Sequence, residues 1–162
     1  MPAPEIHSTT SPTSIAATCA LYNLTPAEFA QLHARAVAAK ATAYCPYSHF
    51  HVGCVLLTAG GEYIPGANVE NASYPVTTCA ERVAFGRAIT SGHRGFKAVA
   101  VATDISPPAS PCGMCRQCIR EFCELSMPVV MFDGSGGYSV MRLEELLPMS
   151  FGPEALGVPS VA

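Results

Sequence analysis

Apolar and polar residues recur along this chain with two periods, one typical of helices and one typical of strands. From Thr25 to about residue 43, small and apolar residues follow helical spacing. The segment begins with Thr25-Pro26-Ala27-Glu28, which combines a capping box with proline at the first helical position. This stretch therefore predicts the first long helix.

Five short apolar segments predict strands, and three further segments have helical periodicity. The predicted strands are 51–58, 62–69, 96–103, 128–132 and 138–141, and the predicted helices are 79–91, 112–125 and 143–147. A Gly-Gly turn at residues 60–61 joins the first two strands into a hairpin. Segments 96–103 and 128–132 are almost wholly apolar, which favours burial on both faces.

The order of these elements predicts an α/β protein whose mixed five-stranded sheet is covered by helices on both faces. A chain of 162 residues is long enough to form a hydrophobic core without the support of disulfide bonds or structural metals. We expect a single domain over residues 23–162. Residues 1–22 begin with a stretch rich in Ser, Thr and Pro, and we expect them to be a disordered extension.

The amino-acid composition narrows the range of possible partners and locations. Charged residues make up 13% of the chain, about half the usual quarter, which suits a protein that hides surface in an oligomer. The net charge is -3 and no basic run is present, so a nucleic acid polymer is not an expected partner. No apolar run approaches the roughly 18 residues of a membrane span, and residues 1–15 lack signal-peptide character. We expect no membrane partner and a cytoplasmic location, with a nuclear presence left open.

Three of the eight cysteines stand at the starts of predicted helices. Cys79 opens one helix, and Cys112 and Cys115 open another three residues apart, on one face. Both helices follow loops and precede buried strands, so their N-termini can lie side by side. A helix N-terminus lowers the pKa of a thiol and supports the thiolate that a metal needs. Three thiolates with an open fourth position are typical of a catalytic zinc site.

Two neighbours of Cys79 complete this chemistry. Three thiolates and Zn²⁺ sum to one negative charge, which Arg82 and the two helix N-termini can offset. Glu81 is close to the metal but points elsewhere on the helix, so it is placed to move protons rather than to bind zinc.

Two other readings of the cysteines are open at this point. A lone CxxC is often structural, and the spacing Cys112-x2-Cys115-x2-Cys118 resembles an iron–sulfur ligand set. On a helix, however, Cys118 is turned about 240° from Cys112, away from a shared metal. We expect the remaining five cysteines to be apolar packing residues, namely Cys19, Cys45, Cys54, Cys118 and Cys123.

Five ordered blocks carry a family resemblance that covers about residues 43–156. They are Tyr44-Cys45-Pro46-Tyr47-Ser48-His49-Phe50, Asn68-Val69-Glu70-Asn71-Ala72-Ser73-Tyr74-Pro75, Cys79-Ala80-Glu81-Arg82, Ser110-Pro111-Cys112-Gly113-Met114-Cys115-Arg116-Gln117 and Glu145-Leu146-Leu147-Pro148-Met149-Ser150-Phe151. In these blocks the chain resembles the cytidine deaminases, small zinc enzymes that act on free nucleosides. The resemblance implies a three-layer α/β/α sandwich and hydrolytic deamination of cytidine and 2′-deoxycytidine.

The resemblance also implies roles for single residues. One Zn²⁺ per subunit would be held by Cys79, Cys112 and Cys115, with Glu81 as the catalytic proton carrier. Substrate contacts would come from Phe50 on the pyrimidine ring, the Ala80 backbone on the base edge, and Asn68 and Glu70 on the ribose. Arg82 and Gln117 would hydrogen-bond the zinc thiolates. Tyr74 and Phe151 would approach a neighbouring subunit's site, which implies a homotetramer.

Two rival functions remain at this stage. One is a deaminase of another aminopyrimidine or of a nucleoside antibiotic, and the ribose pair Asn68 and Glu70 speaks against it. The other is a non-catalytic zinc or iron–sulfur binding module, and Glu81 beside an open metal position speaks against that. A carboxylate close to the sugar repels a phosphate, which favours a nucleoside over a nucleotide. The preference between ribose and deoxyribose is left open by the sequence.

Overall fold

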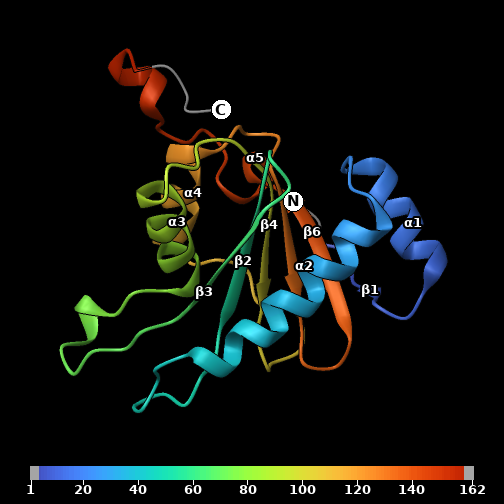
Figure 1. Cartoon of the computed structure of the whole chain (residues 1–162), viewed down its shortest axis with the longest axis horizontal. Coiled ribbons are helices and arrows are strands. Elements are labelled where there is room, and N and C mark those ends of the chain that lie inside the picture. The colour runs from blue at the N-terminus through green and yellow to red at the C-terminus, as the bar shows by residue number, and fades with distance from the viewer. Residues whose placement is uncertain (1–3, 159–162) are drawn as a thin grey trace.

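The computed structural model describes residues 4–158, which form one six-stranded sheet with helices on both faces (Figure 1). The strands are β1 (His7–Ser8), β2 (Gly53–Thr58), β3 (Tyr63–Ala67), β4 (Phe96–Ala102), β5 (Pro128–Phe132) and β6 (Gly137–Arg142). The helices are α1 (Pro12–Leu21), α2 (Pro26–Ala39), α3 (Ala80–Thr90), α4 (Gly113–Phe122) and α5 (Leu143–Leu146). Short 3₁₀ turns follow at Lys40–Thr42, Tyr74–Val76 and Pro153–Leu156.

The sheet is mixed, as predicted. Its strand order is β1-β6-β5-β4-β2-β3, and β4 and β5 are the parallel pair, joined through α4. The other neighbours are antiparallel. Because α3 precedes β4 and α4 precedes β5, both helices begin at the same end of the sheet, where β4 ends.

Apolar side chains from the central strands fill a core on each face of the sheet. On β4, Val99 and Val101 pack with α3 and α4, whereas Ala98, Ala100 and Ala102 pack with α2. This alternation follows from the two-residue period of a strand. It confirms that segment 96–103 is buried on both faces.

A glycine sets how closely α3 approaches the sheet. Gly66 on β3 lies against the first turn of that helix, and a Cβ atom there would come within 2.5 Å of the Ala80 carbonyl oxygen and of the Ala84 nitrogen. No side chain fits into that space, so strand backbone and helix backbone are in direct contact. This contact fixes the height at which α3 begins.

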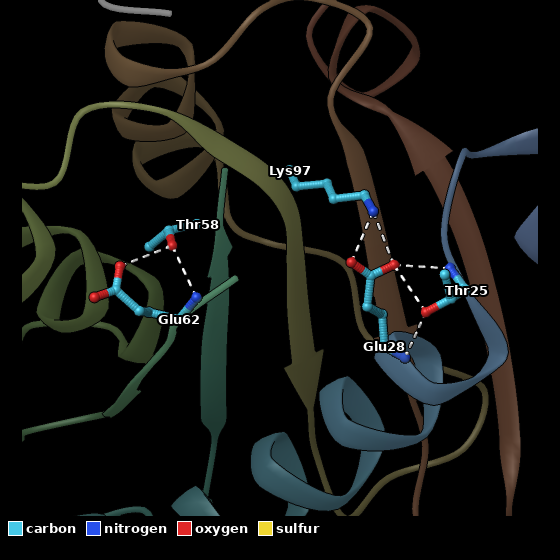
Figure 2. Close-up of polar contacts among 5 residues, drawn as sticks. All are labelled: Thr25, Glu28, Thr58, Glu62 and Lys97. Carbon is cyan, nitrogen blue, oxygen red and sulfur yellow. Dashed lines mark hydrogen bonds and ion pairs between the residues drawn. The ribbon is translucent and has the colours of Figure 1, made fainter. Parts of the chain in front are cut away.

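The start of α2 is tied to the sheet by side-chain hydrogen bonds (Figure 2). Thr25 Oγ1 accepts from the Glu28 backbone N–H at 3.1 Å, and Glu28 Oε2 accepts from the Thr25 N–H at 2.7 Å. Lys97 on β4 donates to both Glu28 carboxylate oxygens, at 2.7 and 2.8 Å. The predicted capping box is confirmed. Figure 2 also shows the β2–β3 turn, where Thr58 and Glu62 bond one another.

The N-terminal segment differs from the expectation of disorder over residues 1–22. Residues 4–22 contain β1, which pairs with β6, and helix α1, whose Ser11 cap accepts from the Ser14 N–H. Inside α1, Thr18 is buried and its hydroxyl bonds the Tyr138 hydroxyl at 2.8 Å. The extension therefore adds a sixth strand to the five predicted, and residues 1–3 lie outside the described part.

No helix within residues 4–158 is long and apolar enough to cross a membrane.

Candidate active site

The structure brings the three candidate metal ligands together. Cys79 is the N-cap of α3, Cys112 is the N-cap of α4, and Cys115 lies in the first turn of α4. Their three Sγ atoms lie within 4.8 Å of one another, and the Sγ atoms of Cys79 and Cys112 are 3.9 Å apart. The side-by-side arrangement of the two helix N-termini is thereby confirmed.

This sulfur triangle fits zinc. Tetrahedral zinc with Zn–S bonds of about 2.3 Å sets its sulfur atoms about 3.8 Å apart, close to the distance between Cys79 and Cys112. Neither helix N-cap makes a side-chain cap bond, and the positive ends of α3 and α4 lie at the thiols that begin them. The donor set is soft, anionic and close to two positive helix ends.

The pKa values of Cys79 and Cys115 shift in opposite directions. Hydrogen bonds from the Cys115 thiol and from the Arg82 guanidinium lower the pKa of Cys79 to about 5. The same bond to Cys79, together with burial, raises the pKa of Cys115. Arg82 Nη2 lies 3.7 Å from the Cys79 sulfur and donates to the Thr77 carbonyl oxygen at 2.9 Å. Arg82 therefore lies beside the Cys79 sulfur, as a hydrogen-bond donor to that thiolate should.

Glu81 is the buried acid of the site. The residue is 4% exposed, and this burial raises the pKa of its carboxyl. It lines a cavity of about 450 Å³ together with Cys79 and Cys112. A carboxyl group that holds its proton more tightly than usual, beside a metal site, is suited both to accept and to return a proton.

Most of the expected substrate contacts line the same cavity. Phe50, Asn68, Glu70 and Ala80 all contribute to its wall. The rest of the wall comes from Ser48, Val52, Thr77, Val101, Thr103, Ala109 and Ser110. The polar pair Asn68 and Glu70 thus shares one cavity with the cysteines and Glu81.

Glu70 is held in its ionised form. Its Oε2 accepts from the backbone N–H groups of Tyr47 and Ser48, at 2.9 and 3.2 Å, and its Oε1 accepts from the Ser48 hydroxyl. The Ser48 hydroxyl and the two N–H groups hold the pKa of Glu70 below its usual range. A carboxylate has about four acceptor positions, so one remains for a ligand.

Asn68 fixes the loop that carries Phe50. Its Oδ1 accepts from the Val52 N–H at 2.9 Å, and its Nδ2 donates to the Phe50 carbonyl oxygen at 2.8 Å. The amide still has a second lone pair and a second hydrogen. Asn68 can therefore orient the wall residue Phe50 and contact a ligand at the same time.

Comparison with known proteins agrees with this geometry. The family model of the cytidine and deoxycytidylate deaminase zinc-binding region matches residues 27–131. The cytidine deaminases of Sporosarcina psychrophila and Halalkalibacterium halodurans are 46% and 44% identical, over 78% and 74% of this chain and 93% and 90% of their own lengths. The crystal structure of cytidine deaminase from Burkholderia pseudomallei superposes with a TM-score of 0.74 at 41% identity, covering 75% of this chain and 98% of that one.

The chain belongs to the cytidine deaminase family. The resemblance of the five sequence blocks and the expected fold are confirmed. The zinc-binding region that matches includes Cys79, Cys112 and Cys115, which supports zinc as the cofactor. Within residues 4–158, no other group of three or more Cys, His, Asp or Glu residues has its ligand atoms close enough to share a metal.

The remaining cysteines pack as expected. Cys54 and Cys123 are buried in the core between the sheet and α3 and α4, and Cys118 packs against it. Cys19 belongs to the core on the opposite face, and Cys45 is buried. Within residues 4–158, Cys118 is not among the thiols whose sulfur atoms are close enough to share a metal, which argues against the iron–sulfur hypothesis.

Five expected site residues lie outside the cavity wall, namely Arg82, Cys115, Gln117, Tyr74 and Phe151. Tyr74 is 70% exposed and Phe151 is 60% exposed. Gln117 Nε2 donates to the Phe151 carbonyl oxygen at 3.0 Å. No bond joins Gln117 to a cysteine sulfur in the described part of the chain, so its expected role at the thiolates differs from the contact observed.

The sequence analysis assigns no role to four polar residues of the cavity wall, namely Ser48, Thr77, Thr103 and Ser110. Ser48 has no assigned role within the block of residues 44–50. Its hydroxyl nevertheless donates to the Glu70 carboxylate and accepts from the Phe50 N–H at 3.0 Å. Thr103 ends an apolar strand and carries no motif. The strand period could have revealed it, because residue 103 shares a face with Val101.

Proposed function

We propose that this chain is a zinc-dependent cytidine deaminase that converts cytidine and 2′-deoxycytidine, with water, to the uridine forms and ammonia. The observation that carries the proposal is a single cavity lined by two of the clustered thiols, the buried acid Glu81 and the polar pair Asn68 and Glu70. These groups match the needs of hydrolytic attack on the amine-bearing carbon of a nucleoside base.

Glu81 is the proton carrier at the reacting end. Zinc bound by the three thiolates would supply a Lewis acid that lowers the pKa of a water molecule. Burial keeps the Glu81 carboxyl in the cavity and raises its pKa. It can therefore take a proton from water, deliver it to the ring nitrogen and help the amine leave as ammonia.

The other end of the cavity binds the nucleoside. Phe50 packs against the pyrimidine ring, the Ala80 backbone contacts the base edge, and Asn68 and Glu70 bind ribose hydroxyls. Glu70 retains acceptor capacity for a hydroxyl, and its negative charge disfavours a phosphate on the same sugar. The proposal therefore favours free nucleosides over nucleotides.

The test is ultraviolet absorbance of cytidine, 2′-deoxycytidine and cytidine monophosphate with purified, zinc-loaded protein, and ammonia is measured in parallel. We expect conversion of both nucleosides with one ammonia per base, and much slower conversion of the nucleotide. No change in either nucleoside, from folded and zinc-loaded protein, would contradict the proposal. A panel of other aminopyrimidines and nucleoside antibiotics would then test the second candidate substrate class.

We also propose a homotetramer in which each site is completed at a subunit boundary. Several large apolar side chains are exposed, among them Tyr74, Val76, Met114, Met149 and Phe151. Tyr74 and Phe151 lie outside the cavity of their own chain and are available to a neighbouring one. Sedimentation should give a mass four times the 16.9 kDa of one chain, and a monomer with full activity would contradict the assembly.

A cytoplasmic location is part of the same proposal. Eight cysteines are free of disulfides, which suits a reducing compartment. Imaging of a tagged full-length chain tests this location.

A further inference from the structure

One buried hydroxyl in the cavity wall has no partner. The Thr103 residue is 2% exposed, and its Oγ1 makes no hydrogen bond within the described residues. Buried side-chain hydroxyls are hydrogen-bonded in the large majority of proteins, because an unpaired one has given up its bonds to water. An unpaired hydroxyl in a cavity wall points to a partner that arrives with the ligand.

The strand geometry fixes the face of the sheet on which the Thr103 side chain lies. Thr103 directly follows β4, and its backbone N–H donates to the Phe132 carbonyl oxygen at 3.2 Å, which extends the β4–β5 pairing by one residue. Val99 and Val101 face α3 and α4, so the two-residue period places Thr103 on that same face. It lies one step further toward the end of the sheet where both helices begin.

Neighbouring residues make this position the floor of the cavity. Ala102 pairs with Gly53, so Thr103 lies next to the level of Val52. Val52, Val101 and Thr103 line the cavity together with Glu81. Of these three floor residues from the end of the sheet, Thr103 alone has a polar side chain, and the other two offer only methyl groups.

We propose that Thr103 is a further substrate-contacting residue, whose hydroxyl hydrogen-bonds the polar edge of the pyrimidine base. A hydroxyl accepts from an amino group and donates to a carbonyl. It can therefore serve both the aminopyrimidine substrate and the oxo-pyrimidine product without moving. This inference rests on the proposed function, because it takes a pyrimidine nucleoside as the ligand of the cavity.

Thr18 provides a matched control, since it is also buried but its hydroxyl already has a partner. Thr18 is 5% exposed, and its hydroxyl bonds the Tyr138 hydroxyl in the opposite core. Removal of that hydroxyl breaks a bond that the folded protein already makes. Removal of the Thr103 hydroxyl breaks none, so the two sites should respond in opposite ways.

The experiment compares Thr103→Val, Thr103→Ser and Thr18→Val in the zinc-loaded, full-length protein. For Thr103→Val we expect kcat/KM for cytidine to fall about tenfold, mainly through KM, and uridine to bind about tenfold more weakly by calorimetry. Its zinc content and Tm should equal those of the unsubstituted protein. Thr103→Ser keeps the hydroxyl and should stay within about threefold. Thr18→Val should lower Tm and leave kcat/KM unchanged.

Two results would overturn the inference. One is a Thr103→Val variant whose kcat/KM and uridine affinity stay within about twofold of the starting values. The other is a variant that loses zinc or Tm in parallel with activity, which would make the hydroxyl structural. Failure of the proposed function is distinguishable, because then the unsubstituted protein itself would neither deaminate cytidine nor bind uridine.

Discussion

Helices α2 and α3 both carry a glutamate in their first turn, yet the two glutamates have opposite surroundings. Glu28 of α2 bonds the Thr25 N–H and the Lys97 ammonium (Figure 2), and chiefly the bond from Lys97 holds its pKa below the usual range. Glu81 of α3 is buried beside a cysteine N-cap that makes no side-chain cap bond, and burial raises its pKa.

The same residue type at the same helix position can therefore serve either structure or chemistry. At α2 the hydrogen-bond donors and acceptors of the first turn are used within the fold. The glutamate therefore stabilises the helix and is not available to bind a ligand. At α3 no side-chain bond is made by the N-cap, which is itself a candidate metal ligand, and the glutamate lines the cavity. A helix start that is left uncapped at the end of a sheet is therefore the feature to search for.

Removal of one thiolate should abolish the metal chemistry at the start of α3 and α4. Cys115→Ala should lose zinc, all measurable deamination and some stability, because two remaining sulfurs cannot hold the metal in a tetrahedral site. Cys118→Ala, one turn further along α4, is the matched control and should keep zinc. Metal analysis of both variants decides the point, and a full equivalent of zinc in Cys115→Ala would contradict the ligand set.

Exchange of each glutamate for glutamine separates their roles. Glu81→Gln should keep zinc and fold but lose about 10³-fold in kcat, because the amide cannot carry a proton. Glu28→Gln should keep kcat and lower Tm instead. Steady-state kinetics and thermal melts of the two variants give a crossed pattern, and substantial turnover by Glu81→Gln would remove it from the role of proton carrier.

Loss of the α2 cap should cost stability alone. Thr25→Ala removes the oxygen that accepts from the Glu28 N–H, which should lower the free energy of unfolding by about 1 kcal/mol. Thr25→Ser keeps that oxygen and serves as the control. Urea denaturation measures the difference, and an equal loss in both variants would assign the effect to the threonine methyl group rather than to the cap.

The smallest effect is the pH dependence of the bond between Glu28 and Lys97. The folded-state pKa of Glu28 lies below the value of about 4.3 expected for an unfolded chain. The ionised pair therefore stabilises the fold fully above that value, and this stabilisation is lost as the pH falls through the folded pKa. The stability gap between the unsubstituted protein and Glu28→Gln should be present at pH 6.5 and shrink at pH 3. A constant gap would show that charge is not its cause.

Much of this architecture could be predicted because local patterns and tertiary packing agree. The all-apolar segments became the central strands, and the cysteine spacing anticipated two helix starts that meet. Helix α1 was not predicted because it has no apolar stripe. Its only sequence signals are Ser11 as a cap and Pro12 in the first turn. Its order comes from long-range contacts such as the bond between Thr18 and Tyr138.

The hydrogen-bond partners within the site could not be predicted from the sequence, for a different reason. Ser48 reaches Glu70 across 22 positions, and Gln117 reaches Phe151 across 34. No periodicity encodes which of several hydrogen-bond acceptors a long side chain will choose. Residue types at the site were therefore predictable, whereas their pairings needed coordinates.

Gly66 has a consequence for how this chain would tolerate mutation. It carries no chemical group and does not line the cavity, yet the missing methyl group lets α3 rest directly on β3. Any larger residue would push away the turn that bears Glu81 and tilt it relative to the sulfur triangle. In a survey of random variants, Gly66 would be as intolerant of change as Glu81. A geneticist without the structure would mistake this glycine for a catalytic residue.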